Sequence, residues 1–148
     1  MPEQCPDQDR NDSSTGEPLP DAFRSVARQL RRASLESLAR WGVTPSQSRA
    51  LGVLTRHGVM RLSELSEHLR IAPRSTTEVV DDLEAKDLIE RRPDPQDRRA
   101  TLVGLTEHGV DVGEAIRSAT GSDAERFFDK LPPADRQHLA RILHTLQE

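Results

Sequence analysis

Several residue types that build common functional sites are scarce in this sequence. Cys5 is the single cysteine, so a disulfide within the chain is excluded and a cysteine-based metal site has too few ligands. There is no tyrosine, one tryptophan and three phenylalanines, which argues against an aromatic platform that stacks single-stranded bases. A glycine-rich phosphate loop, a nucleophile elbow and a zinc-hydrolase histidine motif are also missing. We therefore expect neither enzymatic activity nor a cofactor.

Long apolar runs are missing as well. The sequence has no stretch of 18 apolar residues, and its start, MPEQCPDQDRNDSS, has neither the basic nor the apolar part of a secretory signal. We therefore expect a cytoplasmic protein with no membrane partner. With 148 residues, of which 34% are apolar and 31% charged, the chain fits one thin domain that completes its burial in an oligomer.

The formal charge of −4 is unevenly distributed. Residues 1–20 hold five acidic residues and one base, Arg10, whereas the remaining 128 residues hold 20 acidic and 20 basic residues. A cluster of bases in this neutral part can still bind an anionic partner, because binding depends on the local field. Residues 1–18 are rich in Pro, Asp and Ser and lack apolar periodicity, so we expect a disordered tail there.

Two helices are predicted after the tail. Apolar and small residues recur at helical spacing over 19–41, and Gly42 follows as a stop signal. The segment TPSQSRALGVLTRHG then offers Thr44 as N-cap, Pro45 at the first helical position and Gly58 as the stop. The sequence thus predicts a long first helix and a separate second one.

The next two predicted helices match a helix-turn-helix. A short helix over 63–69 is followed by a longer one that begins near Pro73. Two short helices joined by a tight turn, the second with small polar residues near its start, are typical of this DNA-binding motif. The longer helix has an expected buried stripe of Thr76, Val79, Val80 and Leu83, and an expected exposed stripe of Arg74, Thr77, Glu78 and Asp81.

After these helices the apolar period changes to two. LIERR and ATLVGL flank the turn DPQDRRAT and predict a two-stranded hairpin, the wing of a winged helix-turn-helix. Arg98 and Arg99 lie together in this turn, and arginine suits both phosphates and the negative potential of a narrow minor groove. Asp97 is expected to hold one guanidinium so that the other points outward. A solvated charged turn is the alternative when the turn is taken alone.

Two more helices complete the predicted fold. One begins near residue 106, and Pro132-Pro133 separates it from the last. The fold class predicted is mainly α with a small β wing, in a single domain over 19–148. A winged helix-turn-helix lobe spans 45–105, and helical segments over 19–41 and 106–148 flank it.

The run LSELSEHLRIAPRSTTEVVDDLEAKDLIERRPDPQDRRATLVGLTEHG closely resembles the winged helix-turn-helix of MarR-type transcriptional regulators. The resemblance extends over about residues 19–148. It implies a homodimer whose dimerisation helices are the segments 19–41 and 106–148, bound to double-stranded, pseudo-palindromic operator DNA, usually as a repressor that a small-molecule effector modulates. The motifs that carry it are Leu83-Glu84, Arg91, Asp97-Arg98-Arg99, and Leu105-Thr106 with Gly109.

The resemblance also implies which residues bind DNA. Arg91 and Asp97 would support the wing, whose DNA contacts would come from Arg98 and Arg99. Base-edge contacts would come from Arg74, Ser75, Thr76 and Thr77.

Three residues depart from the family pattern. Glu78 replaces a basic or neutral residue, so it either repels phosphate or reads cytosine. Ala72, at the N-cap of the recognition helix, cannot cap it by side chain, which costs about 1 kcal/mol. Asp87 replaces the usual glycine after this helix, and aspartate tolerates a left-handed conformation.

Other signals leave alternatives open. Trp41 is a candidate for lining an effector site, although core packing is the more common role of a lone tryptophan. The five histidines show no helical pairing, so we predict no metal site within the chain; a metal-responsive site assembled across a dimer stays open. A protein-interaction module without DNA binding is the other alternative, suggested by Glu78, Asp81 and Asp82, which we otherwise interpret as part of a solvated face.

Overall fold

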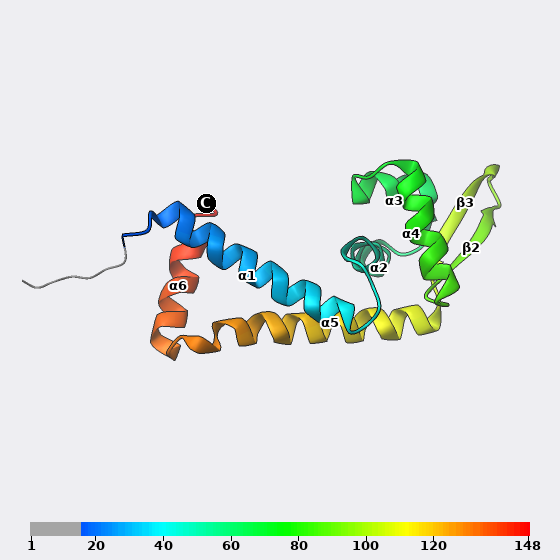
Figure 1. Cartoon of the computed structure of the whole chain (residues 1–148). Coiled ribbons are helices and arrows are strands. Elements are labelled where there is room, and N and C mark those ends of the chain that lie inside the picture. The colour runs from blue at the N-terminus through cyan, green and yellow to red at the C-terminus, as the bar shows by residue number, and fades with distance from the viewer. Residues whose placement is uncertain (1–15) are drawn as a thin grey trace, which may run out of the picture.

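The long helix α5 (Glu107–Phe127) runs beneath both halves of the molecule (Figure 1). The computed structural model describes residues 16–148, so Cys5 and most of the predicted disordered tail lie outside the described residues. One end of α5 joins a lobe that contains α2 (Pro45–His57), β1 (Met60–Arg61), α3 (Leu62–Leu69), α4 (Pro73–Ala85), β2 (Ile89–Asp94) and β3 (Asp97–Leu105). The other end lies beside α1 (Leu19–Ala39), η1 (Phe128–Lys130) and α6 (Pro133–Thr145).

Helix ends in the lobe follow the local sequence signals. The Thr44 hydroxyl accepts the backbone N–H of Gln47 at 3.2 Å, and the Gln47 side chain accepts the Thr44 N–H at 3.2 Å, which caps α2 as predicted. Gly42 and Gly58 have φ values of 66° and 74°, so both predicted stops are confirmed. Asp87 has φ 58° and ends the α4 region in the left-handed conformation that the sequence predicted.

The wing belongs to a three-stranded antiparallel sheet of order β1-β3-β2. The sequence predicted only its two-stranded hairpin. The missing strand, β1, pairs Met60 with Val103 and Arg61 with Leu102. Two residues are too short to display an alternating pattern, so periodicity could not reveal β1.

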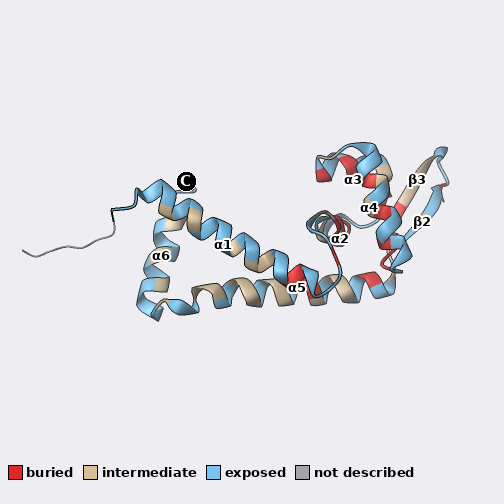
Figure 2. Ribbon diagram, in the orientation of Figure 1, coloured by how far each residue is buried: buried red, intermediate tan, exposed pale blue. Residues whose placement is uncertain are grey.

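The core lies mainly in the lobe, and Leu38 of α1 and Ile116 of α5 also belong to it. Figure 2 shows buried residues gathered on α2, α3, α4 and the sheet, with few along α1 and none on α6. The inner faces of these elements meet each other, so the lobe buries its apolar residues without a second chain. The core side chains with an exposed fraction of at most 1% are Leu65, Leu69, Val80, Leu83, Ile89 and Val103, together with Ala50.

The motif formed by Leu105, Thr106 and Gly109, called LT..G below, joins the lobe to α5. The Thr106 hydroxyl donates to the carbonyl oxygen of Asp87 at 2.6 Å and accepts the N–H of Gly109 at 2.9 Å. Thr106 also donates its own N–H to Leu88 at 3.1 Å. A Cβ atom at position 109 would lie 1.9 Å from the Leu88 carbonyl oxygen, so only glycine fits. The motif is a structural junction that fixes the start of α5 against the turn after α4.

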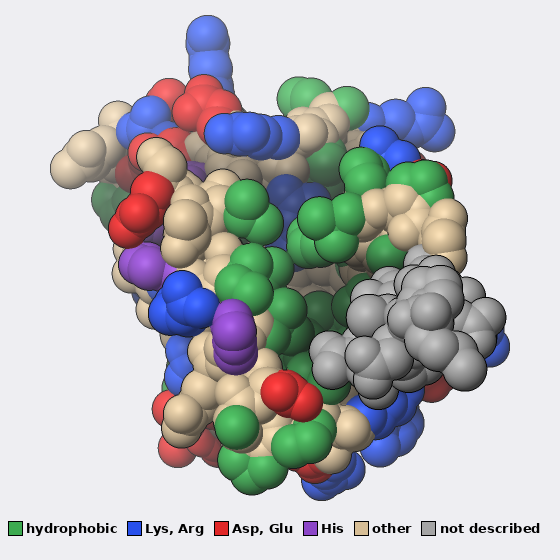
Figure 3. All heavy atoms as spheres, turned by 90° about the vertical axis from the view of Figure 1, so that its left-hand side faces the viewer, with side chains coloured by type: hydrophobic (Ala, Val, Ile, Leu, Met, Phe, Trp, Pro, Cys, Tyr) green, Lys and Arg blue, Asp and Glu red, His purple; other side chains and the backbone are tan. Residues whose placement is uncertain are grey.

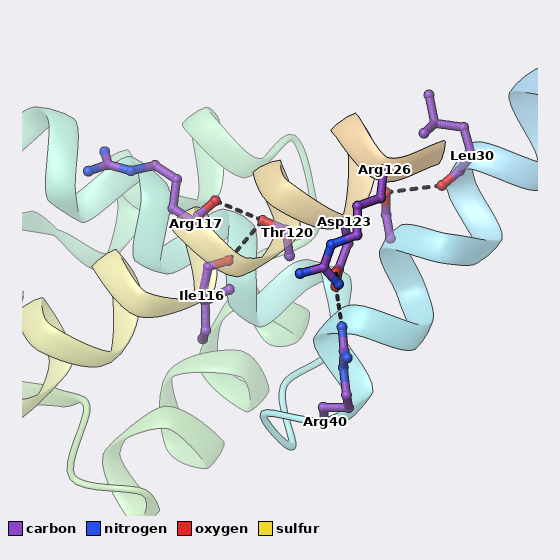
Figure 4. A network of polar contacts seen from close by, with 8 residues as sticks. Leu30, Arg40, Ile116, Arg117, Thr120, Asp123 and Arg126 are labelled. Carbon is purple, nitrogen blue, oxygen red and sulfur yellow. Dashed lines mark hydrogen bonds and ion pairs between the residues drawn. The ribbon is translucent and has the colours of Figure 1, made fainter. Parts of the chain in front are cut away.

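The scaffold helices α1, α5 and α6 bury little. Arg40, which directly follows α1, pairs through its guanidinium with Asp123 of α5 (Figure 4). No residue of α6 is buried. Figure 3 views this end of the molecule and shows hydrophobic side chains around a hollow. Large apolar side chains on α1 and beyond α6 are exposed, including Leu19 (82%), Phe23 (56%) and Leu146 (75%).

No helix within residues 16–148 has both the length and the apolar character that crossing a bilayer requires.

Candidate nucleic-acid interface

The outer face of α4 presents polar side chains to solvent. Arg74, Ser75 and Glu78 are exposed and Thr77 is half-buried. Arg74 and Glu78 lie one turn apart and form an ion pair of 3.5 Å between Nε and Oε1. Both partners are highly exposed, so this pair is weak and either side chain can turn to another partner. Ala72 gives no side-chain cap, as predicted, which leaves first-turn N–H groups of α4 open to an anion.

Thr76 does not belong to this face. Its side chain is fully buried, its hydroxyl accepts from Ser66 at 2.8 Å and it donates to the Ala72 carbonyl at 3.2 Å. The prediction that Thr76 contacts base edges is therefore wrong. The helical spacing of Thr76 with Val80 and Leu83 was the correct signal, because it placed all three on the stripe that faces the core.

Arg91 ties the wing to the recognition helix. Its Nη1 donates to Glu84 at 2.7 Å, its Nη2 pairs with Asp81, and Nη2 also reaches the Thr77 carbonyl at 3.5 Å. Arg91 lies on β2 and its three partners lie on α4, so this one side chain bridges the two elements. Asp81 and Glu84 are thus partners of the wing, in addition to being solvated.

The wing turn is shorter than the sequence suggested. Only residues 95 and 96 separate β2 from β3, so Arg98 and Arg99 lie on β3 and not in the turn. Pro93 pairs with Thr101 and Asp94 with Asp97, so residues 98–100 bulge from the ladder without partners on β2. The bulge thus carries two exposed arginines, Arg98 and Arg99, near the end of the wing.

The aspartates of the wing shape its backbone. Asp97 was expected to hold a guanidinium, but its Oδ1 accepts the backbone N–H of Arg99 at 3.0 Å, and among residues 16–148 its carboxylate has no ion pair. Asp94 is buried; its Oδ1 accepts the N–H of Gln96 at 2.9 Å and its Oδ2 accepts Arg61 Nε at 2.8 Å. The Gln96 N–H, together with the Arg61 guanidinium, outweighs desolvation and lowers the pKa of Asp94 below its ordinary 3.8.

Two further exposed arginines of the lobe were missed from the sequence. Arg70 follows α3 with φ 54°, and Arg92 lies on β2 next to Arg91. Successive strand residues face opposite sides, a period-two signal that could have separated Arg92 from the inward Arg91. Arg70, Arg92, Arg98 and Arg99 are all exposed, and within residues 16–148 none of them has an acidic partner within 4.0 Å.

Comparison with known proteins agrees with this geometry. Residues 43–101 match the sequence profile described as MarR family, which covers most of the lobe. The chain is 32% identical over 126 residues to the uncharacterized HTH-type transcriptional regulator YsmB of Bacillus subtilis (strain 168), with 85% of this chain and 86% of YsmB covered. The chain belongs to the MarR family. It is therefore a helix-turn-helix transcriptional regulator and not an enzyme.

Other MarR-family relatives cover the flanking helices as well. The HTH-type transcriptional repressor MdtR of Bacillus subtilis (strain 168) is 28% identical over 127 residues, spanning 86% of this chain and 82% of MdtR. The crystal structure of RV1404 from Mycobacterium tuberculosis is 32% identical with a TM-score of 0.72, and covers 86% of this chain and 88% of that one. The predicted fold class, mainly α with a small β wing, is confirmed by the observed elements and by this similar crystal structure.

This MarR-family lobe is linked to the end of α1 through a buried glutamine that the sequence did not single out. The Gln47 amide donates to Asp82 of α4 at 3.2 Å, and its Oε1 accepts Lys86 Nζ at 3.1 Å. The Lys86 ammonium also donates to the carbonyl of Gly42. Asp82 and Lys86 are thus connected to the α1–α2 turn, which corrects the view of Asp82 as only part of a solvated face.

Two cavities lie beside the scaffold. Trp41, 40% exposed, lines one of about 670 Å³ with Arg40, Asp123 and Arg126. The other, about 440 Å³, lies between α2 and α5 and includes His68. The His57 and His68 rings stack with centroids 4.5 Å apart, a tertiary pairing that helical spacing could not predict. Within residues 16–148 no group of three or more potential ligand residues forms a metal site.

Proposed function

We propose that this MarR-family regulator acts as a homodimer that binds a pseudo-palindromic operator and represses transcription from it. The observation that carries the proposal is the rigid pairing, through Arg91, of a polar recognition helix with a wing that exposes unpaired arginines. Two such lobes spaced by about 34 Å would enter successive major grooves. The name of MdtR, a transcriptional repressor, supports repression as the outcome.

The scaffold supplies the reason for dimerisation. Its exposed apolar side chains lie on α1 and α6, and a surface of that kind on a small protein is a binding surface in most cases. A two-fold dimer would cover the same residues on both copies at once. Interlocking of 19–41 with 106–148 from two chains would place the lobes on opposite sides.

Roles within the interface divide by chemistry. Arg74, Ser75 and Thr77 would contact base edges in the major groove, because they occupy the accessible face of α4. Arg98 and Arg99, supported by Arg91 and Asp97, would contact phosphates or the minor groove. The arginines missed from the sequence, Arg70 and Arg92, would add phosphate contacts.

A small-molecule effector would act through the Trp41 cavity. Trp41 directly precedes Gly42, whose carbonyl receives Lys86, and Lys86 and Asp82 of the α4 region are held by Gln47. A ligand that moves the α1–α2 turn would therefore displace the recognition helix. It would change DNA affinity only to the extent that it binds the two arrangements with different affinity.

Electrophoretic mobility shift with the DNA upstream of the protein's own gene tests the proposal. We expect a complex that resists competitor DNA, with an affinity that falls steeply with salt because bound phosphates release counterions. Arg98→Ala or Arg99→Ala should weaken binding to every sequence and reduce the salt slope by about 1. Arg74→Ala should instead change the preference among operators by roughly 1–3 kcal/mol.

Two results would replace the proposal, and a third would overturn only its wing contacts. If no competitor-resistant complex forms at low salt, the acidic outer face of α4 becomes the basis of a protein-interaction module. If chelator treatment abolishes DNA binding, the protein is a metal-responsive regulator. If the wing variants bind like the parent at several salt concentrations, the wing assignment is wrong.

A further inference from the structure

The hydroxyl of Thr77 is used inside its own helix. Thr77 Oγ1 donates to the Pro73 carbonyl one turn earlier, at 3.0 Å. Its single proton is therefore engaged, so a half-buried Thr77 can offer a partner its γ-methyl and the acceptor lone pairs of its oxygen, but not a free donor. A threonine chosen for hydrogen-bond donation to a base would have to break this intrahelical bond first.

The surface beside Thr77 is predominantly apolar. A notch of about 570 Å³ between α3 and α4 is lined by Thr77 with Leu62, Ile71 and Pro73, and the polar residues Ser63, Ser66, Glu67 and Arg70 also contribute. Ser66, another lining residue, donates its hydroxyl to Thr76 at 2.8 Å, so this hydroxyl is engaged too. The recognition helix therefore presents a carbon-rich edge next to the exposed Arg74 and Glu78.

Among base edges in the major groove, only thymine carries an apolar group, its C5-methyl. We propose that Thr77, backed by Pro73 and Ile71, is a specificity-determining residue that selects thymine through methyl–methyl contact and not through a hydrogen bond. The inference rests on the proposed operator binding by α4. It assigns to this helix a preference for thymine in each half-site.

The test uses the duplex that the wild-type protein selects from a random-sequence library. Each thymine is replaced singly, and then symmetrically in both half-sites, by deoxyuridine, which removes only the C5-methyl. At one thymine position per half-site we expect a loss of affinity of about fourfold for a single replacement and about sixteenfold for the symmetric pair, the effect of one buried methyl per half-site.

Two variants separate the methyl from the hydroxyl. Thr77→Ser keeps the hydroxyl and should bind thymine and deoxyuridine duplexes equally. Thr77→Val keeps a methyl and should retain the discrimination. Thr55→Ser on α2 removes the same methyl from a threonine whose hydroxyl also donates one turn back, to the Leu51 carbonyl at 2.8 Å; it is the matched control and should leave the thymine-to-deoxyuridine ratio unchanged.

Failure of this inference differs from failure of operator binding. If a selected duplex is bound tightly but deoxyuridine has no effect at any position, thymine is not read through its methyl and the inference is overturned while DNA binding stands. If Thr77→Ser keeps the penalty, another side chain reads the methyl and Thr77 does not. If the library yields no bound duplex, both proposals fall.

Discussion

The lobe and the scaffold differ in how far their apolar side chains are buried within the chain. In the lobe, Leu65, Leu83 and Val103 are fully buried against each other. In the scaffold, α6 buries no residue, and Phe23 and Leu146 are left 56% and 75% exposed. Both regions are helical and amphipathic, so secondary structure alone does not distinguish them.

The difference shows which part of the chain can be stable by itself. Most of the core lies within 45–105, with Leu38 of α1 and Ile116 of α5 added to it, and this lobe is where Arg91 connects the wing to α4. Long helices with exposed apolar side chains gain most of their stability from a partner. We expect substitutions in the two regions to separate experimentally into effects on association and effects on folding.

The largest effect is expected in the scaffold. Phe23→Asp should convert the proposed dimer to monomer, because two-fold symmetry repeats the loss in both copies, at about 3–6 kcal/mol in total. Sedimentation equilibrium at micromolar concentration measures it. Val59→Asp, which changes a 48%-exposed apolar residue of the lobe, is the control and should leave association unchanged. If both variants dissociate equally, association does not depend on the scaffold more than on the lobe, and the proposed difference between the two regions is wrong.

The junction between the regions should be nearly as sensitive. Gly109→Ala places a Cβ 1.9 Å from the Leu88 carbonyl oxygen and should cost about 3 kcal/mol or more of unfolding free energy. Gly121→Ala, on the same helix with no atom within 4 Å, should stabilise the protein by up to about 1 kcal/mol. Urea unfolding at one fixed protein concentration checks both; the same sign for the two variants would contradict the packing described for the LT..G motif.

A moderate effect is expected at the start of the lobe. Thr44→Ala removes the hydroxyl that accepts the Gln47 N–H and should lower the unfolding free energy by about 1 kcal/mol. Because Thr44 lies outside the scaffold helices, the association constant should not change. If Thr44→Ala instead changes the association constant and leaves urea unfolding unaltered, Thr44 contributes to association and not to the stability of the lobe.

The smallest effect concerns pH. Since the pKa of Asp94 is lowered by folding, its carboxylate stabilises the protein above the unfolded value of 3.8, and this stabilisation is lost as pH falls through the lower folded value. Asp94→Asn should therefore show a shallower decline in stability below about pH 4 than the parent does. Urea unfolding across pH 2–6 measures this slope, and parallel curves would show that Asp94 gains nothing from Gln96 and Arg61.

Much of the lobe could be predicted from local sequence. Thr44, Pro45 and Gly58 mark helix ends, and Asp87 marks a left-handed residue, because capping and backbone preference depend on a few neighbouring residues. The strand β1 was not predicted, because two residues are too few to show an alternation of apolar and polar side chains. Thr76 was given a contact that burial forbids, although the same helical period had placed it on the core stripe.

Contacts between elements could not be predicted from local sequence. The stacking of His57 on His68, the grip of Arg91 on α4 and the bridge from Gln47 to Asp82 join residues that no local period relates. The bulge that carries Arg98 and Arg99 depends on the pairing register of two strands, which the turn composition did not specify.

The sequence by itself determined the order of the helices, the cap of α2 and the arginine-bearing hairpin, since these depend on spacing and on each residue's own chemistry. The tertiary structure alone decided which polar side chains remain available to a partner. Long-range packing buries Thr76, engages Arg91 and leaves Arg70 and Arg92 unpaired, and the free energy of such contacts belongs to pairs of elements and not to any single segment.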